Sequence, residues 1–177
     1  METYIALFRG INVGGHGKLP MAELEKTLDG LGLKDIKTYI HSGNVVFNCE
    51  DANKIALADK IRDAIRQNYG FAPNVMLLTS EELNKAIALN PFPEAEDAPK
   101  SLHLFFMESQ PSKPDIKKLD ELKSDSERYL IKDKIFYLHA PEGIGRSKLA
   151  AAVEKKLGVS VTARNWRTVT TVSAKAR

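Results

Sequence analysis

Apolar and polar residues alternate along the first half of the chain in two patterns, one typical of strands and one of helices. Short runs of β-branched and aromatic residues predict strands, and apolar residues that recur every three or four positions predict helices. The expected order is a strand from Thr3 to Phe8 or Arg9, a helix from Pro20 to about Gly30, short strands on either side of 42–44, a helix over 51–70, a strand over 74–79 and a helix over 80–89.

The helix over 51–70 has the clearest pattern of these elements. Asp51 or Asn53 is suited to cap its start, and Gly70 is suited to end it. Ser80 is the expected cap of the following helix. The apolar positions of the helix over 51–70 share one face, which predicts its buried side, and they are Ile55, Ala58, Ile61 and Ile65.

The second half of the chain repeats this order of elements with different residues. A proline-rich acidic stretch lies between the halves and is expected to break regular structure and act as a linker. The predicted elements after it are a strand over 101–108, a helix over 113–123 opened by Pro114, a hairpin over 128–140 that turns at Asp133 and Lys134, a helix over 147–158, a short strand over 159–162 and a helix over 164–176.

The sequence therefore predicts an α+β protein with two ferredoxin-like (βαββαβ) subdomains in tandem and a C-terminal helix. The expected boundaries are residues 1–90, a linker over 91–100, and residues 101–177. The alternative is that short α+β units recur by chance. In a ferredoxin-like unit the first two strands run in the same direction, so the loops that follow them should lie at one end.

Four glycines fall within the segment 10–17, between the first strand and the first helix. A loop of this kind, next to a hairpin turn at 42–44 and near a helix N-terminus, can present backbone N–H groups to an anion. Arg9 is a candidate bidentate partner for that anion, and Lys18 is a candidate point charge. The predicted ligand-binding residues of this first site are Arg9, Asn12, Gly14, Gly15, Ser42, Gly43 and Asn44.

The glycine segment does not match the known phosphate-binding sequences. A Walker sequence that ends at Lys18 would need glycine at Asn12 and Ser or Thr at Leu19. A dinucleotide-binding sequence would need glycine at Pro20, and no doubly wound α/β pattern follows. The alternative explanation is that the glycines serve only turn geometry, with the Asn12 side chain bonding its own loop.

By the same topology, the loop over 143–148 and the segment 164–166 should lie at one end of the second subdomain. A plain structural alternative exists here, because Ser147 is suited to cap a helix and a single tryptophan often packs in a core or a subunit contact. The predicted ligand-binding residues of this end are Lys148, Arg164, Asn165 and Trp166.

Composition narrows the classes of function. The chain has 26 Lys+Arg against 23 Asp+Glu and a net charge of +3, which makes no strong electrostatic case for nucleic acid. Cys49 is the only cysteine, so an internal disulfide is excluded and a reducing compartment is favoured. The N-terminal segment lacks the features of a signal peptide or an anchor, so a cytoplasmic protein without membrane attachment is expected.

The sequence predicts no metal site and no cofactor. Its histidines lack the paired spacing of metal ligands, and no serine or cysteine has an evident base and orienting acid, so no catalytic residue is assigned. The four histidines are His16, His41, His103 and His139.

Five short segments together resemble a bacterial family known as domain of unknown function 1697. The family pattern falls on Arg9–Gly15, Ser42–Asn44 and Arg164–Trp166, and His41 departs from the glutamine expected before Ser42. The resemblance implies two ferredoxin-like subdomains and implies no activity, cofactor or substrate. The segments are YIALFRGINVGG, MAELEKTLDGLG, TYIHSGNVVF, EGIGRSKL and ARNWRTV.

Three functions are compatible with this sequence. The leading hypothesis is the binding of a small phosphorylated or carboxylated molecule at the glycine-rich end of the first subdomain, with or without catalysis. A second is association with nucleic acid through an exposed sheet face and the basic C-terminus, Lys175 and Arg177. A third is a protein-interaction or homodimerisation module, in which Trp166 packs in the dimer interface and the glycine loop is only structural.

Overall fold

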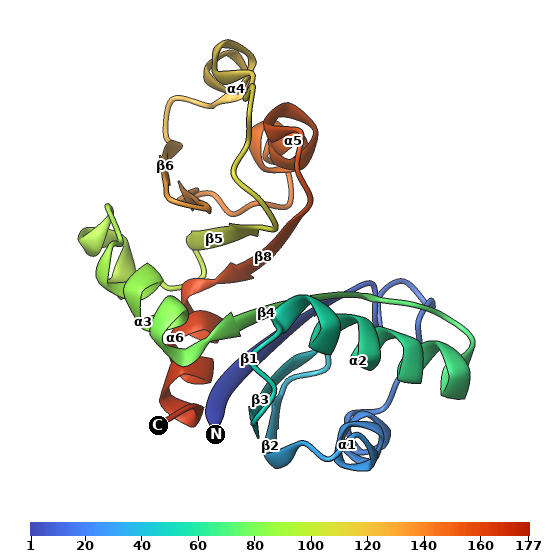
Figure 1. Cartoon of the computed structure of the whole chain (residues 1–177). Coiled ribbons are helices and arrows are strands. Elements are labelled where there is room, and N and C mark those ends of the chain that lie inside the picture. The colour runs from blue at the N-terminus through green and yellow to red at the C-terminus, as the bar shows by residue number, and fades with distance from the viewer. The chain divides into compact units, whose positions relative to one another are not determined.

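The computed structural model describes residues 1–177, which form two compact units (Figure 1). The first unit comprises Met1–Lys85 together with Thr171–Arg177, and the second comprises Ala86–Thr170. The subdomain boundaries at 91–100 stay a prediction. By their contacts, the last residues of the chain group with the first unit.

The first unit contains a four-stranded antiparallel sheet in the order β2-β3-β1-β4. Helices α1 and α2 pack on one face of this sheet (Figure 1). This order and arrangement confirm the ferredoxin-like fold expected from the sequence. The bounds are β1 (Glu2–Arg9), α1 (Met21–Gly30), β2 (Lys34–Tyr39), β3 (Asn44–Cys49), α2 (Lys54–Tyr69), β4 (Asn74–Thr79) and α3 (Ser80–Ala88).

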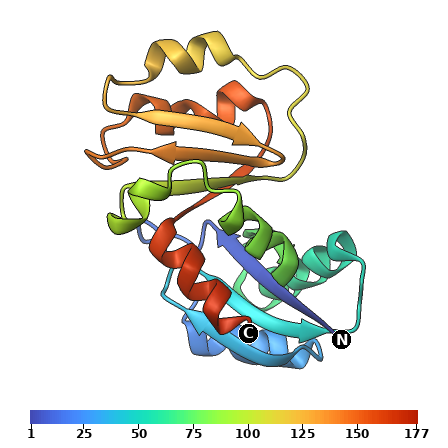
Figure 2. The same cartoon turned by 90° about the vertical axis from the view of Figure 1, so that its left-hand side faces the viewer.

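The inner strands of the first sheet are buried on both faces. Tyr4, Ala6 and Phe8 of β1 pack under α1 and α2, whereas Ile5 and Leu7 point to the opposite face and are also buried. That second face is covered by the start of α3 and the end of α6 (Trp166–Lys175), which Figure 2 shows over the strands. Two bonds fix this cover, from Ser173 Oγ to Asn84 Oδ1 at 2.7 Å and from Lys37 Nζ to the Lys175 carbonyl at 2.9 Å.

Local side-chain chemistry explains where the helices of the first unit begin and end. Asn53 caps α2 through a bond from the Ala56 N–H to its Oδ1, and Gly70 ends the helix with a φ of 78°. Helix α3 starts with a capping box, in which the Glu82 N–H donates to Thr79 Oγ1 and the Thr79 N–H donates to Glu82 Oε2. The cap of α3 is therefore Thr79 and not the expected Ser80.

The prediction that Ile55 lies on the buried face of α2 is wrong. Ile55 is 78% exposed, whereas Leu57, Ile61 and Ile65 are buried against the sheet. Ile55 lies in the first turn of α2, and this turn meets the core through Leu57 instead.

The second unit repeats the architecture with a sheet in the order β6-β7-β5-β8. Its core joins Phe105 and Phe136, whose rings meet edge to face at 5.6 Å, with Leu119 of α4 and Val153 of α5. The bounds are β5 (Leu102–Met107), α4 (Ile116–Leu122), β6 (Arg128–Lys132), β7 (Ile135–His139), α5 (Lys148–Leu157) and β8 (Val161–Asn165).

Two predictions for the second half of the chain are wrong in detail. The proline-rich segment contains a short 3₁₀ helix, η1 (Pro93–Asp97), where no regular structure is expected. The last strand includes Arg164 and Asn165, which the sequence assigns to the start of the final helix. The reason is pairing with β5, because Arg164 lies opposite Leu104 and Asn165 lies opposite His103.

Candidate functional site

The glycine-rich segment between β1 and α1 is a small hairpin. The Val13 N–H donates to the His16 carbonyl at 3.3 Å, and the His16 N–H donates to the Val13 carbonyl at 2.9 Å. The two residues between them, Gly14 and Gly15, have φ values of 57° and 78°. Positive φ at both central residues is the requirement of a type I′ turn, which favours Gly-Gly. These two glycines therefore form an exposed turn.

Gly17 is required for a different reason. A Cβ atom at this position would lie 2.2 Å from the Gly10 carbonyl oxygen, and its φ is 61°. The close approach lets the Asn12 N–H donate to the Gly17 carbonyl at 2.9 Å, which continues the hairpin. Only glycine fits this crossing of two backbone segments.

The Asn12 side chain joins the glycine hairpin to the turn between β2 and β3. Its Nδ2 donates to the Leu19 carbonyl at 2.8 Å and to the His41 carbonyl at 2.9 Å, and its Oδ1 accepts the Leu19 N–H at 2.8 Å. The structure thus brings together two loops that are 29 residues apart, as the predicted strand directions require. Asn12 is a positioning residue, because all the hydrogen atoms of its amide are used within the protein.

The β2–β3 turn is fixed from the other side by Gly43 and Asn44. The Phe8 N–H donates to the Gly43 carbonyl at 2.8 Å, and a Cβ on Gly43 would lie 2.7 Å from the Phe8 Cβ. Asn44 is fully buried, and its Nδ2 donates to the Tyr39 carbonyl at 3.0 Å and to Ser42 Oγ at 3.2 Å. Gly43 and Asn44 therefore hold Ser42 and His41 at the loop end.

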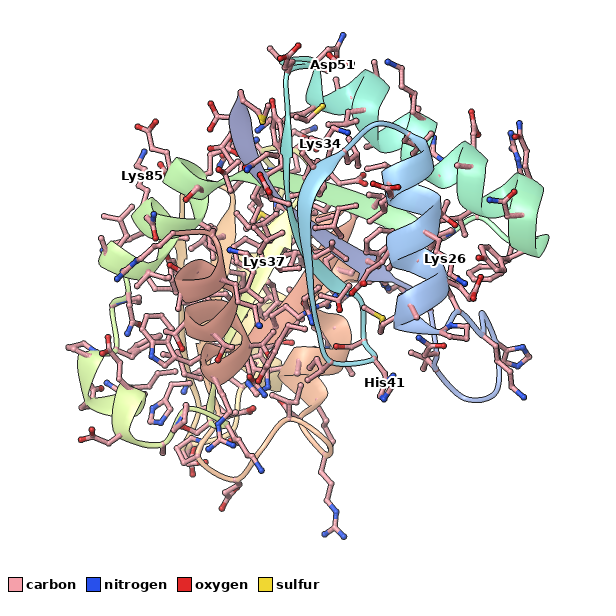
Figure 3. The ribbon with its side chains drawn as sticks, turned by 90° about the horizontal axis from the view of Figure 1, so that it is seen from below. Lys26, Lys34, Lys37, His41, Asp51 and Lys85 are labelled. Carbon is pink, nitrogen blue, oxygen red and sulfur yellow. The ribbon has the colours of Figure 1, made fainter.

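The charges at this loop end all have one sign. The end consists of segments 9–20, 40–43 and 70–73, which contain no Asp or Glu. The opposite end of the β2–β3 hairpin carries charges of both signs, including Lys34, Glu50 and Asp51, and Figure 3 shows His41 and Asp51 at these opposite ends. The basic side chains of the loop end are exposed, and they are Arg9, His16, Lys18 and His41.

The predicted residues of the second unit lie around the starts of α5 and α6. Lys148 is exposed in the first turn of α5, which is capped by Ser147 Oγ accepting the Ala150 N–H at 3.0 Å. Asn165 caps α6 by accepting the Thr168 N–H at 2.9 Å. Arg164 Nη1 donates to the Ala163 carbonyl at 2.9 Å, and burial lowers the pKa of its guanidinium to about 10. Asn165 therefore fixes local structure, whereas Lys148 and Arg164 carry positive charge.

Trp166 is only 6% exposed within the single chain. A role in a dimer interface requires an exposed indole, so this residue does not support the hypothesis of a homodimer built on Trp166.

The inner strands of the sheets offer no open face to nucleic acid. In the second unit, Leu104, Phe106 and Tyr137 point away from α4 and α5 and are nevertheless buried, and the Tyr137 hydroxyl donates to the Ala86 carbonyl at 2.7 Å. The inner strands of the first sheet are buried on both faces as well. Single-stranded nucleic acid stacks on exposed aromatic platforms, and the inner strands of neither sheet present one, so the hypothesis of an exposed sheet face finds no support.

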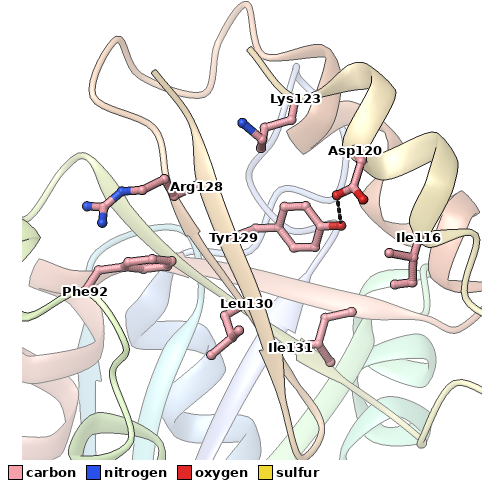
Figure 4. Close-up of a pocket in the computed structure, with 8 residues that line it drawn as sticks. All are labelled: Phe92, Ile116, Asp120, Lys123, Arg128, Tyr129, Leu130 and Ile131. Carbon is pink, nitrogen blue, oxygen red and sulfur yellow. Dashed lines mark hydrogen bonds between the residues drawn. The ribbon is translucent and has the colours of Figure 1, made fainter. Parts of the chain in front are cut away.

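Two features of the second unit escape prediction from the sequence. His103 is buried, its Nδ1 atom has no hydrogen-bond partner, and burial lowers the pKa of the imidazole from 6.5 to about 4. A groove also follows β6, lined by aromatic, aliphatic and charged residues (Figure 4). The only sequence signal for this groove is the apolar run over 129–131 between two basic residues, and such a run fits any hairpin strand.

Metal binding and membrane insertion find no support in the geometry. No group of three or more His, Cys, Asp or Glu side chains is arranged to hold a metal ion. None of the helices combines the length and the apolar character that crossing a membrane requires.

Comparison with known proteins extends these observations. The conserved bacterial protein SP0830 from Streptococcus pneumoniae has a solved structure that matches 99% of this chain and 99% of its own, with 26% sequence identity and a TM-score of 0.78. Among curated proteins, none matches this chain. The family described as "Protein of unknown function (DUF1697)" matches residues 1–137. The chain therefore belongs to the DUF1697 family.

Proposed function

We propose that this protein binds a small anionic molecule, carrying a phosphate or a carboxylate, at the loop end of its first unit. The observation that carries the proposal is the Asn12 amide, which locks the glycine hairpin to the β2–β3 turn. This bridge collects Arg9, His16, Lys18 and His41 at one end without any acidic side chain in its loops. An excess of one sign of charge favours ligands of the other sign.

The residues of this end take different parts in the proposed binding. Arg9 offers a planar fork suited to a phosphate or carboxylate, and Lys18 offers a point charge. The exposed N–H groups of the Gly14–Gly15 turn add uncharged donors. Ser42 lies at the β2–β3 turn. The remaining predicted residues, Asn12, Gly43 and Asn44, act by holding the two loops of this end in place.

The second unit carries its own predicted ligand residues. Exposed Lys148 is the member suited to direct contact with an anion, at the start of α5. In the proposal, Arg164, Asn165 and Trp166 act by fixing the start of α6 and the end of β8.

Thermal unfolding with a ligand panel tests the proposal for the first unit. The panel contains inorganic phosphate, nucleotides, sugar phosphates and carboxylates. A ligand at a hundred times its Kd adds about 2.7 kcal/mol, which raises Tm by roughly 5 to 11 °C for a chain of this size. We expect such a shift with the wild type and its loss in Arg9→Ala.

A matched control separates the site from net charge. Lys34→Ala removes one exposed positive charge from β2, at the far end of the strand from His41 (Figure 3). This variant should keep the wild-type shift. The proposal fails if no member of the panel shifts Tm, or if Arg9→Ala and Lys34→Ala lower the shift equally.

A further inference from the structure

The second sheet ends at an edge strand, β6 (Arg128–Lys132), which bonds only to β7. The hairpin turns through Asp133 and Lys134, so Lys132 lies directly opposite Ile135 and Leu130 opposite Tyr137. In a hairpin with a two-residue turn these are the pairs that exchange backbone bonds. The N–H and C=O groups of Tyr129 and Ile131 therefore point outward, and no protein group bonds them.

A groove of about 570 Å³ follows this edge and includes side chains from both faces of β6 (Figure 4). On one face Leu130 lies near Phe92, and on the other Tyr129 and Ile131 lie near Ile116 of α4. Leu130 and Ile116 are 39% and 40% exposed, although both are aliphatic. The free backbone row is thus flanked by accessible apolar surface on each side.

The walls of the groove are held in place by their own contacts. The Tyr129 ring stacks on Phe136 at 4.8 Å, with an interplanar angle of 11°, and its hydroxyl donates to Asp120. The Arg128 guanidinium lies over the Phe92 ring at 4.8 Å and pairs with Glu94. Rigid walls lower the entropy lost when a ligand binds.

Two lysines lie along this edge, because Lys123 lines the groove and Lys132 is the last residue of β6. Lys123 Nζ donates only to the carbonyls of Ser124 and Glu127, and Lys132 Nζ only to the carbonyl of Leu89. These acceptors are neutral, so neither lysine forms a salt bridge. A ligand with negative charges at both ends would complement them.

We propose that β6 is a docking edge for an extended peptide of a partner protein, with an apolar centre and an acidic residue at each end. The peptide would add a strand to the sheet by bonding the outward backbone groups of Tyr129 and Ile131. Its central side chains would lie on Leu130 and Ile131, and its acidic residues would lie at the two ends of β6, near Lys123 and Lys132.

A second copy of this chain fits the edge less well. Antiparallel pairing of two β6 strands centred on Leu130 would place Arg128 of each strand opposite Lys132 of the other, and like charges in directly opposed positions are unfavourable. Edge strand β2 differs from β6, because an irregularity lies between Lys34 and Lys37 and Asp35 has a φ of 52°. Such irregular, charged edges resist pairing.

Fluorescence anisotropy with synthetic peptides tests the proposal on the full chain. The probe is fluorescein-Gly-Ser-Glu-Val-Val-Ile-Glu-Ser-amide, whose two glutamates are spaced as Arg128 and Lys132 are. Two comparison peptides carry N-methyl groups on the three apolar residues, or lysine in place of both glutamates. We expect saturable binding of the probe and at least a tenfold weaker affinity for each comparison peptide, since two lost hydrogen bonds are worth about that factor.

Two variants locate the binding surface. Leu130→Asp places a carboxylate in the centre of the groove and should weaken probe binding at least about tenfold, because it removes apolar surface and repels an acidic peptide. Ile55→Asp, on the exposed side of α2, is the matched control and should leave binding unchanged. Circular dichroism checks that both variants fold. If Leu130→Asp does not fold, the N-methylated peptide still tests the proposal on the wild type.

The proposal is overturned if the wild type shows no saturable binding, if the N-methylated or lysine-flanked peptide binds as well as the probe, or if a folded Leu130→Asp binds normally. Sedimentation of the wild type tests the other candidate for this edge, which is a second copy of the chain. Self-association that Leu130→Asp abolishes, without probe binding, would assign the edge to a second copy of the chain and also overturn the proposal.

Discussion

At the scale of single residues, the loop end of the first unit shows how side chains that look like ligand groups can serve the fold. Asn12 and Asn44 both use their amides on backbone carbonyls of neighbouring loops. The sequence indicates a polar loop with candidate donors, but it does not show which donors are already used. The charged residues, Arg9 and Lys18, keep exposed positions there.

Two glycines of the same hairpin predict different costs of substitution. Gly14→Ala adds a Cβ in open space at a φ of 57°, so we expect a loss of about 1 kcal/mol in the free energy of unfolding. Gly17→Ala adds the same strain and a clash with the Gly10 carbonyl, so a loss of about 3 kcal/mol or more is expected. Urea denaturation measures both values, and equal losses would contradict the backbone crossing at Gly17.

His103 predicts a dependence of stability on pH. Its pKa falls from 6.5 to about 4 on folding, so the unfolded state binds the proton more tightly in that interval. Stability from this residue is fully present above pH 6.5 and is lost as the pH falls toward 4, by about 3 kcal/mol in total. His103→Gln should remove this part of the pH dependence.

The measurement for His103 is the free energy of unfolding of wild type and His103→Gln at several pH values. Carboxylates contribute mainly below this range, and the difference between the two proteins cancels their effect. A difference that stays constant between pH 7 and pH 4.5 would show that the buried imidazole does not titrate as expected.

At the scale of elements, helices and hairpins follow from local chemistry, and their errors come from tertiary contacts. The Asn53 cap and the Gly70 stop of α2 are readable because capping and positive φ depend on neighbouring residues only. The extension of β8 to Asn165 cannot be predicted from local sequence, because it depends on pairing with β5. Residue spacing alone also predicts that Ile55 is buried, because helical periodicity does not show where along the helix the core ends.

The two apolar residues at the start of α2 give a test of this point. Leu57→Ala should lower the free energy of unfolding by about 2 to 5 kcal/mol, because Leu57 is buried among core residues. Ile55→Ala should change it by no more than about 0.5 kcal/mol, because Ile55 is 78% exposed. Chemical denaturation of the two variants checks the orientation of the helix, and a larger loss at Ile55 would reverse it.

At the scale of the whole molecule, the burial of Trp166 bears on the oligomeric state of the protein in solution. Trp166 is 6% exposed in one chain, so its burial does not require a partner. The emission maximum of Trp166 should be blue-shifted and constant over a hundredfold range of protein concentration. An indole that is buried within one chain stays buried on dilution, because its burial does not depend on an association equilibrium. A red shift on dilution would show that association buries the indole.

The sequence by itself determined the order of the elements, the fold class of each unit and the meeting of the glycine hairpin with the β2–β3 turn. These follow from periodicity, capping and strand direction, which are local or topological properties. Only the tertiary structure decided that Asn12 and Asn44 are used internally, that the inner strands of the sheets are buried on both faces, and that β6 has a free edge beside a groove. These properties depend on which distant groups meet, and residue spacing does not encode which hydrogen bonds and apolar surfaces remain unused.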